Sequence, residues 1–323
     1  MCAITLTDAG KGLVKRIAFS LPRAAFAAFD RGVPLYISRM SHVLHYAPDN
    51  ASLVVRLVLE ELRLPYRTEL VDRGVSAQHG ATYRRLNPVG RIPALETPDG
   101  PIFETAAICL WLADRHRDGP KLSPDLTNAQ RGAFLSWLFF LSNTVHAEMR
   151  TLFYPSLVAG DDPQMQAVVS QKTQASLTGH FDLLNAAHGH SDPDVTLCHL
   201  YLSVLLRWPA LYPVAADRSW FDLGRWPNLH ALARRIEARE SAQAAALAEG
   251  LGQTPFSNPN PATPPEGSAL QSCFCPSSTC SRSGSARPRP TRWARWSPPR
   301  GSSTRCAPRR SAPPGSRPRC MAR

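Results

Sequence analysis

The stretch from Asn87 to Thr105, NPVGRIPALETPDGPIFET, contains the groups best suited to bind a small peptide-like ligand. Pro93 stands at the entry to a strand-like run. A proline there cannot donate to the ladder, so it belongs at an edge or a tight turn, where the Ile92–Pro93 bond is a candidate for cis. Such a turn leaves neighbouring backbone groups free to pair with an extended peptide. Glu104 and Thr105 open a helical pattern and add a carboxylate, a hydroxyl and free amides. Together these groups predict a pocket for a small peptide with a charged end.

The surrounding pattern alternates between strands and helices in a defined order. Strand-like runs are expected at 42–46, 66–71, 94–97 and 101–104, with a Pro-Asp-Gly turn between the last two. Apolar residues at helical spacing predict helices over 52–62 and 105–116. The order strand–helix–strand followed by strand–strand–helix is that of a thioredoxin-like domain, which we place at residues 40–118.

The second half of the chain is helical wherever it is periodic. After a linker at 119–126, helical patterns cover 128–154, 163–187, 196–208 and 227–249, and they define an all-helical domain at 127–252. The expected fold class is therefore α/β followed by all-α. No apolar run reaches the ~18 residues needed to span a membrane.

These motifs resemble the glutathione S-transferase family, whose glutathione site is built on a run of this form. The resemblance covers about residues 40–269. It implies that the backbone of Ile92, next to Pro93, pairs with the cysteinyl part of glutathione. It also implies that Glu104 and Thr105 hold the γ-glutamyl end, with Thr in place of the family's Ser, and that Arg91 reaches the glycine carboxylate.

The residue that activates the thiol is left open by the sequence. In one large bacterial class of the family the loop reads Pro-Gly-Ala-Cys-Ser, and here Ala51 stands at the position of that Cys. Three alternatives remain. Ser52 begins the first helix and is otherwise a helix cap, Tyr46 ends the first strand and is otherwise a packed aromatic, and Asn50 is an amide donor that otherwise makes the turn.

The two ends of the chain differ in composition from the middle. The net charge is +12, but residues 270–323 contain 12 Arg and no acidic residue, residues 1–39 carry +4, and residues 40–269 carry −4. We interpret 1–39 as a leader or a misassigned start and 253–323 as a disordered Pro/Ser/Arg-rich tail that is read out of frame from about 270. This distribution argues against a nucleic-acid partner. Chance explains the tail cysteines better than a metal site does, and we expect no metal.

The sequence thus predicts a soluble, cytoplasmic glutathione S-transferase that acts in detoxification. By family analogy it forms a homodimer and conjugates the thiolate of glutathione, its co-substrate, to a small hydrophobic electrophile. Two alternatives use the same fold. One is a glutathione-binding module without turnover, made credible by the missing Cys. The other is a glutathione-dependent isomerase or reductase.

Overall fold

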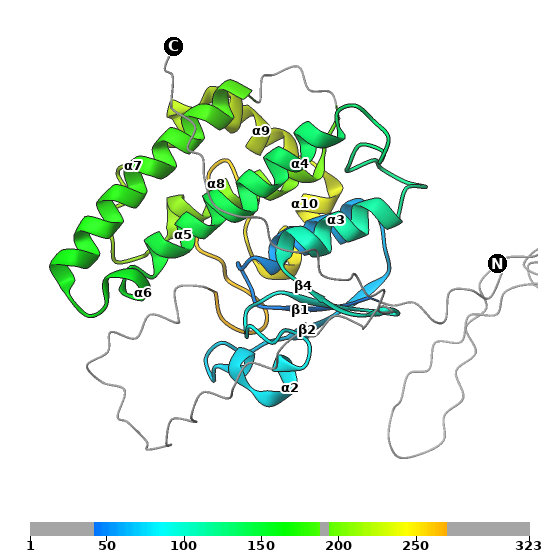
Figure 1. The fold of residues 1–323 in the computed structure, drawn as a ribbon, viewed down its shortest axis with the longest axis horizontal. Helices are drawn as coiled ribbons and strands as arrows, with labels where there is room; N and C mark the ends of the chain where they lie inside the picture. Colours follow the sequence, from blue (N-terminus) through cyan, green and yellow to red (C-terminus); the bar gives the residue numbers. More distant parts are fainter. Residues whose placement is uncertain (1–41, 188–193, 270–323) are drawn as a thin grey trace, which may run out of the picture. The chain divides into compact units, whose positions relative to one another are not determined.

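The computed structural model describes residues 42–187 and 194–269 (Figure 1). The expectations for 1–39 and for 270–323 lie outside these residues. In the described part of the chain, no helix is both long and apolar enough to cross a membrane.

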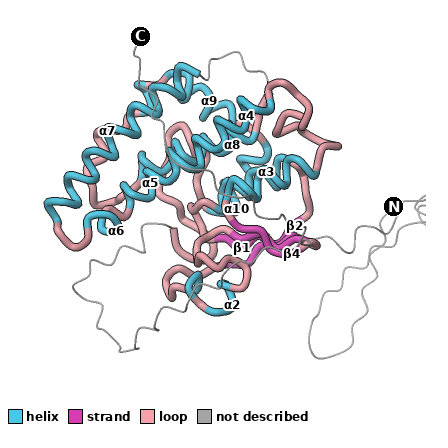
Figure 2. Tube along the Cα trace, in the orientation of Figure 1, coloured by secondary structure: helices cyan, strands magenta, loops and turns pink. Residues whose placement is uncertain are grey.

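The amino-terminal half is a four-stranded sheet with helices on it, as the sequence predicts. Its order is β2-β1-β3-β4, with β1 and β2 parallel and the β1–β3 and β3–β4 pairs antiparallel (Figure 2). The parallel pair needs a crossover connection, which α1 supplies. The elements are β1 (His42–Tyr46), α1 (Ser52–Glu61), β2 (Tyr66–Leu70), a 3₁₀ turn (Ala77–His79), α2 (Ala81–Arg84), β3 (Ala94–Thr97), β4 (Gly100–Phe103) and α3 (Thr105–Arg115).

The second half is entirely helical, so the predicted fold class is confirmed. Its helices are α4 (Arg131–Phe139), α5 (His146–Phe153), α6 (Ser156–Ala159), α7 (Pro163–Ala187), α8 (Leu197–Leu211), α9 (Pro227–Glu237) and α10 (Glu240–Glu249). A π-helical segment, Phe140–Val145, joins α4 to α5, and a 3₁₀ turn, Leu223–Arg225, precedes α9. The single helix expected over 227–249 is two helices, because Arg239 leaves the helical region with ψ at 147°.

The core is continuous between the two halves because α1 is buried along most of its length. One side of α1 faces the sheet, and its other sides contact α8 and α10. Leu44 on β1 and Leu95 on β3 pair directly and are fully buried beneath it. An apolar run without a polar face is the sequence pattern of a helix that is covered all round.

The prediction of disorder from residue 253 is wrong for 253–269. Phe256 is fully buried, and the backbone amides of Phe256 and Ser257 donate to the Glu237 carboxylate at 3.3 and 3.0 Å. Gly267 has a φ of +72°, and a Cβ there would lie 2.7 Å from the Leu70 side chain. The segment therefore packs against α9 of the helical half and against the amino-terminal half, anchored by one aromatic and by hydrogen bonds rather than by a large apolar area.

Candidate functional site

Strand pairing brings the predicted ligand-binding groups to one end of the sheet. His45 on β1 pairs with Ala94 on β3, which pairs in turn with Phe103 on β4. The residues next to this row are the loop after β1, the Ile92–Pro93 bond before β3, and Glu104 after β4. The Ile92–Pro93 bond is cis, as the sequence suggested. Three segments far apart in the chain thus meet at one edge.

The turn before Pro93 is fixed by side chains that hold the carbonyl of Arg91. The Tyr83 hydroxyl and the Asn87 amide both donate to this oxygen at 2.7 Å. Among the described residues, no hydrogen bond uses the backbone N–H or carbonyl of Ile92, which is partly exposed. Its backbone is therefore held in place and available to an extended ligand.

Two helices begin at this end of the sheet. The α1 helix starts at Ser52 and α3 at Thr105, so both helix N-termini lie near the row. In α1 the amides of Leu53 and Val54 already donate to the carbonyls of Asn50 and Ala51. Glu104, the residue before α3, has a φ of 71° and an exposed side chain, whereas Thr105 is buried. Helix N-termini favour negative charge, so this edge of the sheet suits an anionic group of a ligand.

The helical half contributes a hydrogen-bonded chain that ends at Thr105. The Tyr201 hydroxyl on α8 lies 2.8 Å from Nδ1 of His146 on α5 and is also hydrogen bonded to the Thr105 side chain. Burial, with a smaller effect of the Arg91 charge, lowers the pKa of His146 to about 4. His146 is therefore neutral at pH 7. The sequence analysis missed both Tyr201 and His146, because only the tertiary fold places them beside Thr105.

Comparison with known proteins finds similarity to glutathione S-transferases. Residues 51–115 match the model of the glutathione S-transferase N-terminal domain. The glutathione S-transferase GstA of Escherichia coli O157:H7 is 28% identical over 210 residues, which are 64% of this chain and 98% of GstA. The structure of a sphingomonad glutathione S-transferase complexed with glutathione is 27% identical with a TM-score of 0.54, over 65% of this chain and all of that one. This chain is similar to glutathione S-transferases along most of its described residues.

A relative with another activity has similar coverage. The disulfide-bond oxidoreductase YfcG of Escherichia coli K12 is 27% identical over 216 residues, which are 65% of this chain and 96% of YfcG. Similarity to glutathione S-transferases therefore leaves the reaction to be argued from the site.

Two of the three predicted thiol activators are buried inside the protein. Ser52 is fully buried, and its hydroxyl donates to the Ala47 carbonyl at 3.0 Å and accepts from the Ala47 amide at 3.3 Å. The Tyr46 ring is 5% exposed and lies under the Arg56 guanidinium, 4.8 Å from its centroid. Burial raises the pKa of Tyr46. Both residues hold the loop and the first helix together.

Asn50 differs from them. Its backbone carbonyl accepts from the Leu53 amide at 2.8 Å, which starts α1, while its side chain is partly exposed. In the described part of the chain, no hydrogen bond of the Asn50 carboxamide is found within the protein. Among the described residues neither the Asn50 carboxamide nor the Tyr46 hydroxyl has a hydrogen-bond partner, but Asn50 is partly exposed whereas Tyr46 is buried, so Asn50 is the candidate more open to a ligand at the start of α1.

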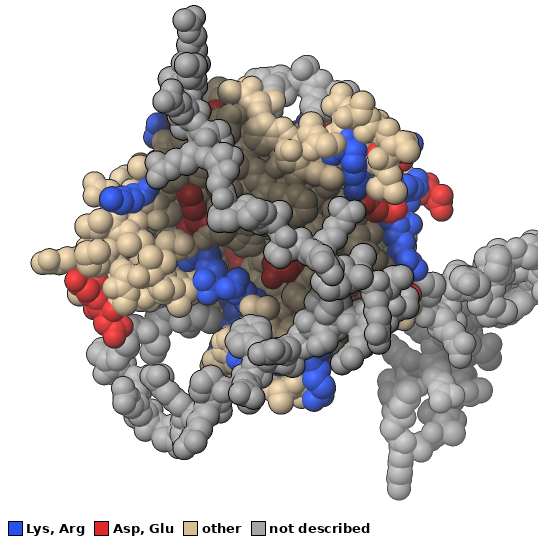
Figure 3. Space-filling model, in the orientation of Figure 1, with Lys and Arg blue, Asp and Glu red and all other residues tan. Residues whose placement is uncertain are grey.

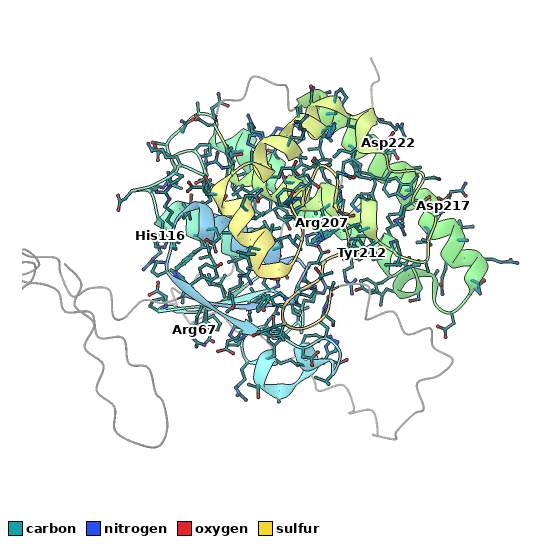
Figure 4. The ribbon with its side chains drawn as sticks, turned by 180° about the vertical axis from the view of Figure 1, so that it is seen from behind. Arg67, His116, Arg207, Tyr212, Asp217 and Asp222 are labelled. Atoms are coloured by element: carbon teal, nitrogen blue, oxygen red, sulfur yellow. The ribbon has the colours of Figure 1, made fainter. Side chains whose placement is uncertain are left out.

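The residue before Asn50 makes an ion pair that the sequence analysis did not predict. Asp49 and Arg207 on α8 are both fully buried and form two parallel hydrogen bonds of 2.9 Å. Tyr212, just after α8, donates to Asp49 Oδ2 at 2.6 Å. Figure 4 shows Arg207 and Tyr212 near one another on the side of the helices that faces the sheet. The available signal was a lone arginine within the apolar run SVLLRWPAL, because a buried charge needs a partner.

Basic side chains border the site on the side of α5. In the space-filling view, Lys and Arg atoms gather between α5 and the sheet, next to acidic atoms (Figure 3). Burial and the neighbouring Arg91 charge lower the pKa of Arg150. Neither the Arg91 guanidinium nor the Arg150 guanidinium forms an ion pair with a described residue. Two adjacent cations without a carboxylate are suited to an anionic ligand group.

Proposed function

We propose that this protein is a glutathione transferase that conjugates the thiolate of glutathione to a small hydrophobic electrophile. The observation that carries the proposal is the row His45–Ala94–Phe103, because it brings the free backbone of Ile92, the start of α3 and the Asn50 loop to one edge. Support also comes from similar glutathione S-transferases, among them a structure complexed with glutathione.

Glutathione has two carboxylates, one ammonium group and one thiol, and the site offers a complement to each. In the proposed complex, Ile92 pairs with the cysteinyl residue as an added strand would, beside Pro93. The Glu104 carboxylate takes the ammonium group, and the hydroxyl and amides at Thr105 take the γ-glutamyl carboxylate. Arg91 takes the glycine carboxylate.

Asn50 is the proposed activator of the thiol. A free thiol has a pKa near ~8.5, and only the thiolate attacks electrophiles well. A hydrogen bond from the Asn50 amide and the positive end of the α1 dipole would both favour the anion. The thiolate sulfur then bonds to the electrophilic carbon while the leaving group departs with its electron pair.

The helical half supplies the proposed electrophile side. His146 stacks near Trp208, with ring centroids 5.1 Å apart, and Tyr201 lies edge-on to it at 5.8 Å. A neutral imidazole among aromatic rings presents little charge to a reactant, which favours an apolar electrophile over a strongly hydrated one.

The test is the ultraviolet absorbance of the bound thiolate across pH. The wild type is expected to show a thiol pKa well below that of free glutathione, and Asn50→Ala to raise it towards the free value. Ser52→Ala and Tyr46→Phe are the comparisons. Retention of the wild-type pKa in Asn50→Ala, with its loss in Tyr46→Phe, would move the assignment to Tyr46. Binding without any depression of the pKa would instead identify a binding module without turnover, and failure to bind glutathione would overturn both.

A glutathione-dependent disulfide reductase is the second candidate, favoured by the similarity to YfcG. In this reaction one glutathione thiolate attacks a disulfide, and a second resolves the mixed disulfide to oxidised glutathione. Both thiols would come from glutathione, because the described cysteines are buried and burial raises the pKa of Cys109 and, to about 12, that of Cys198. Turnover of a small disulfide faster than of an aryl halide would favour this reaction.

The proposal extends to a cytoplasmic homodimer, which the family resemblance implies. Light scattering coupled to size-exclusion chromatography tests the dimer, since a monomeric mass at micromolar concentration would contradict it.

A further inference from the structure

The loop that carries Asn50 is held from the helical half by one side chain. Arg207 lies 158 residues further along the chain and donates from Nε and Nη2 to the two carboxylate oxygens of Asp49, each at 2.9 Å. Both side chains have no exposed surface. A planar guanidinium that meets a carboxylate with two parallel bonds fixes direction as well as distance.

The remaining groups of this pair are also satisfied. Arg207 donates to the carbonyls of Pro255 at 3.0 Å and Asn260 at 2.9 Å, both in the carboxy-terminal segment. Tyr212 adds its bond to Asp49. Four hydrogen bonds donated by the Arg207 guanidinium thus join the loop that carries Asn50, α8 and the segment 253–269. Paired and fully hydrogen-bonded charges are the form in which ions persist in a protein interior.

Asp49 is also held through its backbone. Its φ of 49° lies in the left-handed region, which aspartate tolerates better than most residues other than glycine. Its amide donates to Glu249 Oε2 at 2.9 Å, and Glu249 is paired with Arg56 of α1 at 2.8 Å. The Asp49 backbone sets the direction of the peptide that leads into Asn50.

The other side of the loop contacts the carboxy-terminal segment. Arg73 donates to the Ser268 carbonyl at 2.9 Å and to the Pro48 carbonyl at 3.4 Å. A Cβ on Gly267 would come within 3.4 Å of Pro48. Pro48 and Asp49 are therefore fixed from two directions, while the Asn50 side chain is left without a partner among the described residues.

We infer that Arg207 is a positioning residue for thiol activation, which acts through Asp49 to hold Asn50 and the start of α1 in the geometry that stabilises the thiolate. The inference rests on the proposed function. It assigns to the helical half, and to the segment 253–269 bound to the same guanidinium, a part in the chemistry of the glutathione site.

The test compares Arg207→Lys with Arg239→Gln. Lysine keeps the charge but loses the paired bonds. Arg239 donates to Glu61 at 3.0 Å, so it also bridges α1 to the helical half, but at the far end of α1 from the loop. The thiol pKa of bound glutathione is measured from its absorbance across pH, and the dissociation constant is measured with S-methylglutathione, which has no thiol.

For Arg207→Lys we expect the thiol pKa to rise by about one unit, which is about tenfold less thiolate below both values. The dissociation constant of S-methylglutathione should change less than about threefold, because this ligand has no thiol to ionise. A threefold change is only a small fraction of the binding free energy. Arg239→Gln should keep the wild-type thiol pKa even where it lowers the melting temperature. If Arg207→Lys does not fold, Tyr212→Phe removes one bond to Asp49 and should shift the pKa in the same direction by less.

Three outcomes would overturn the inference. A wild-type thiol pKa in Arg207→Lys, or in Tyr212→Phe if that variant is used, would leave the proposed function standing and remove the positioning role. An equal shift in Arg239→Gln would show a general effect of lost stability. Absence of a depressed pKa in the wild type would remove the transferase proposal together with the inference.

Discussion

The charge state of His146 predicts how acid destabilises this protein. In the folded state the pKa of His146 is lowered to about 4 by burial, whereas an unfolded histidine titrates near ~6.5. Between these two values the unfolded chain binds a proton that the folded chain does not. Stability therefore falls as the pH drops from about 6.5 to about 4, and it has no contribution from this group above that window.

The size of the effect follows from the two values. At pH 5, an unfolded pKa near ~6.5 and a folded pKa near ~4 correspond to a loss of about 2 kcal/mol relative to pH 8. His146 is partly exposed, so solvent screening reduces the loss to about 1–2 kcal/mol. His146→Gln removes the titrating group and leaves an acceptor for the Tyr201 hydroxyl. Its stability relative to the wild type should therefore rise by this amount between pH 8 and pH 5.

The assay is urea unfolding followed by tryptophan fluorescence at a series of pH values. His42 and His116 also have pKa values lowered by burial, so only the difference between variant and wild type isolates His146. Tyr201→Phe is the control, because it removes the hydrogen-bond partner but keeps the imidazole and should keep the acid dependence. A difference between His146→Gln and the wild type that stays constant from pH 8 to pH 5 would refute the reasoning.

Three further outcomes follow from burial and hydrogen bonding. Phe256→Ala should cost about 3–5 kcal/mol in a urea titration, because its fully buried side chain anchors the carboxy-terminal segment; a cost below ~1 kcal/mol would show that the segment adds little to stability. Cys109 and Cys198 should resist alkylation in the native protein and react after denaturation, because burial raises the pKa of both thiols. Peptide masses measure the labelling. Rapid labelling of the native protein would contradict the packing. Thr105→Val should weaken glutathione binding about 10-fold, because it loses about 1.4 kcal/mol of hydrogen bonding. Calorimetry measures the affinity. An unchanged affinity would place the γ-glutamyl group elsewhere.

Much of the amino-terminal half could be predicted because its signals are local. Turn residues, a proline before a strand and helical apolar spacing all act within a few positions, and they located the four strands, α1 and α3 to within one residue. The 3₁₀ turn and α2 between β2 and β3 were not predicted. The row that brings Ile92 and Glu104 together follows from strand pairing, which the order of elements already implied.

The rest depended on contacts across the chain. Residues 253–269 are rich in Pro, Ser and Asn, a composition typical of disorder. An average over the composition gives no weight to a single buried anchor such as Phe256. Asp49 looked like a turn residue because its partner, Arg207, lies in a distant helix. Likewise Ser52 and Tyr46 have the right types for catalysis, and only the packed structure shows that both are buried and that the Ser52 hydroxyl is bonded to the loop.

The pairing of Asp49 with Arg207 also determines when, during synthesis, the loop that carries Asn50 can reach its final structure. Synthesis reaches the partner of Asp49 only 158 residues later, which takes about 8–30 s at ordinary translation rates. The backbone acceptors at Pro255 and Asn260 emerge later still. Until then the sheet can form, but the aspartate beside Asn50 has no cation to neutralise it. In a nascent chain stalled before α8, the sheet can therefore be formed while the loop that carries Asn50 still lacks its ion pair.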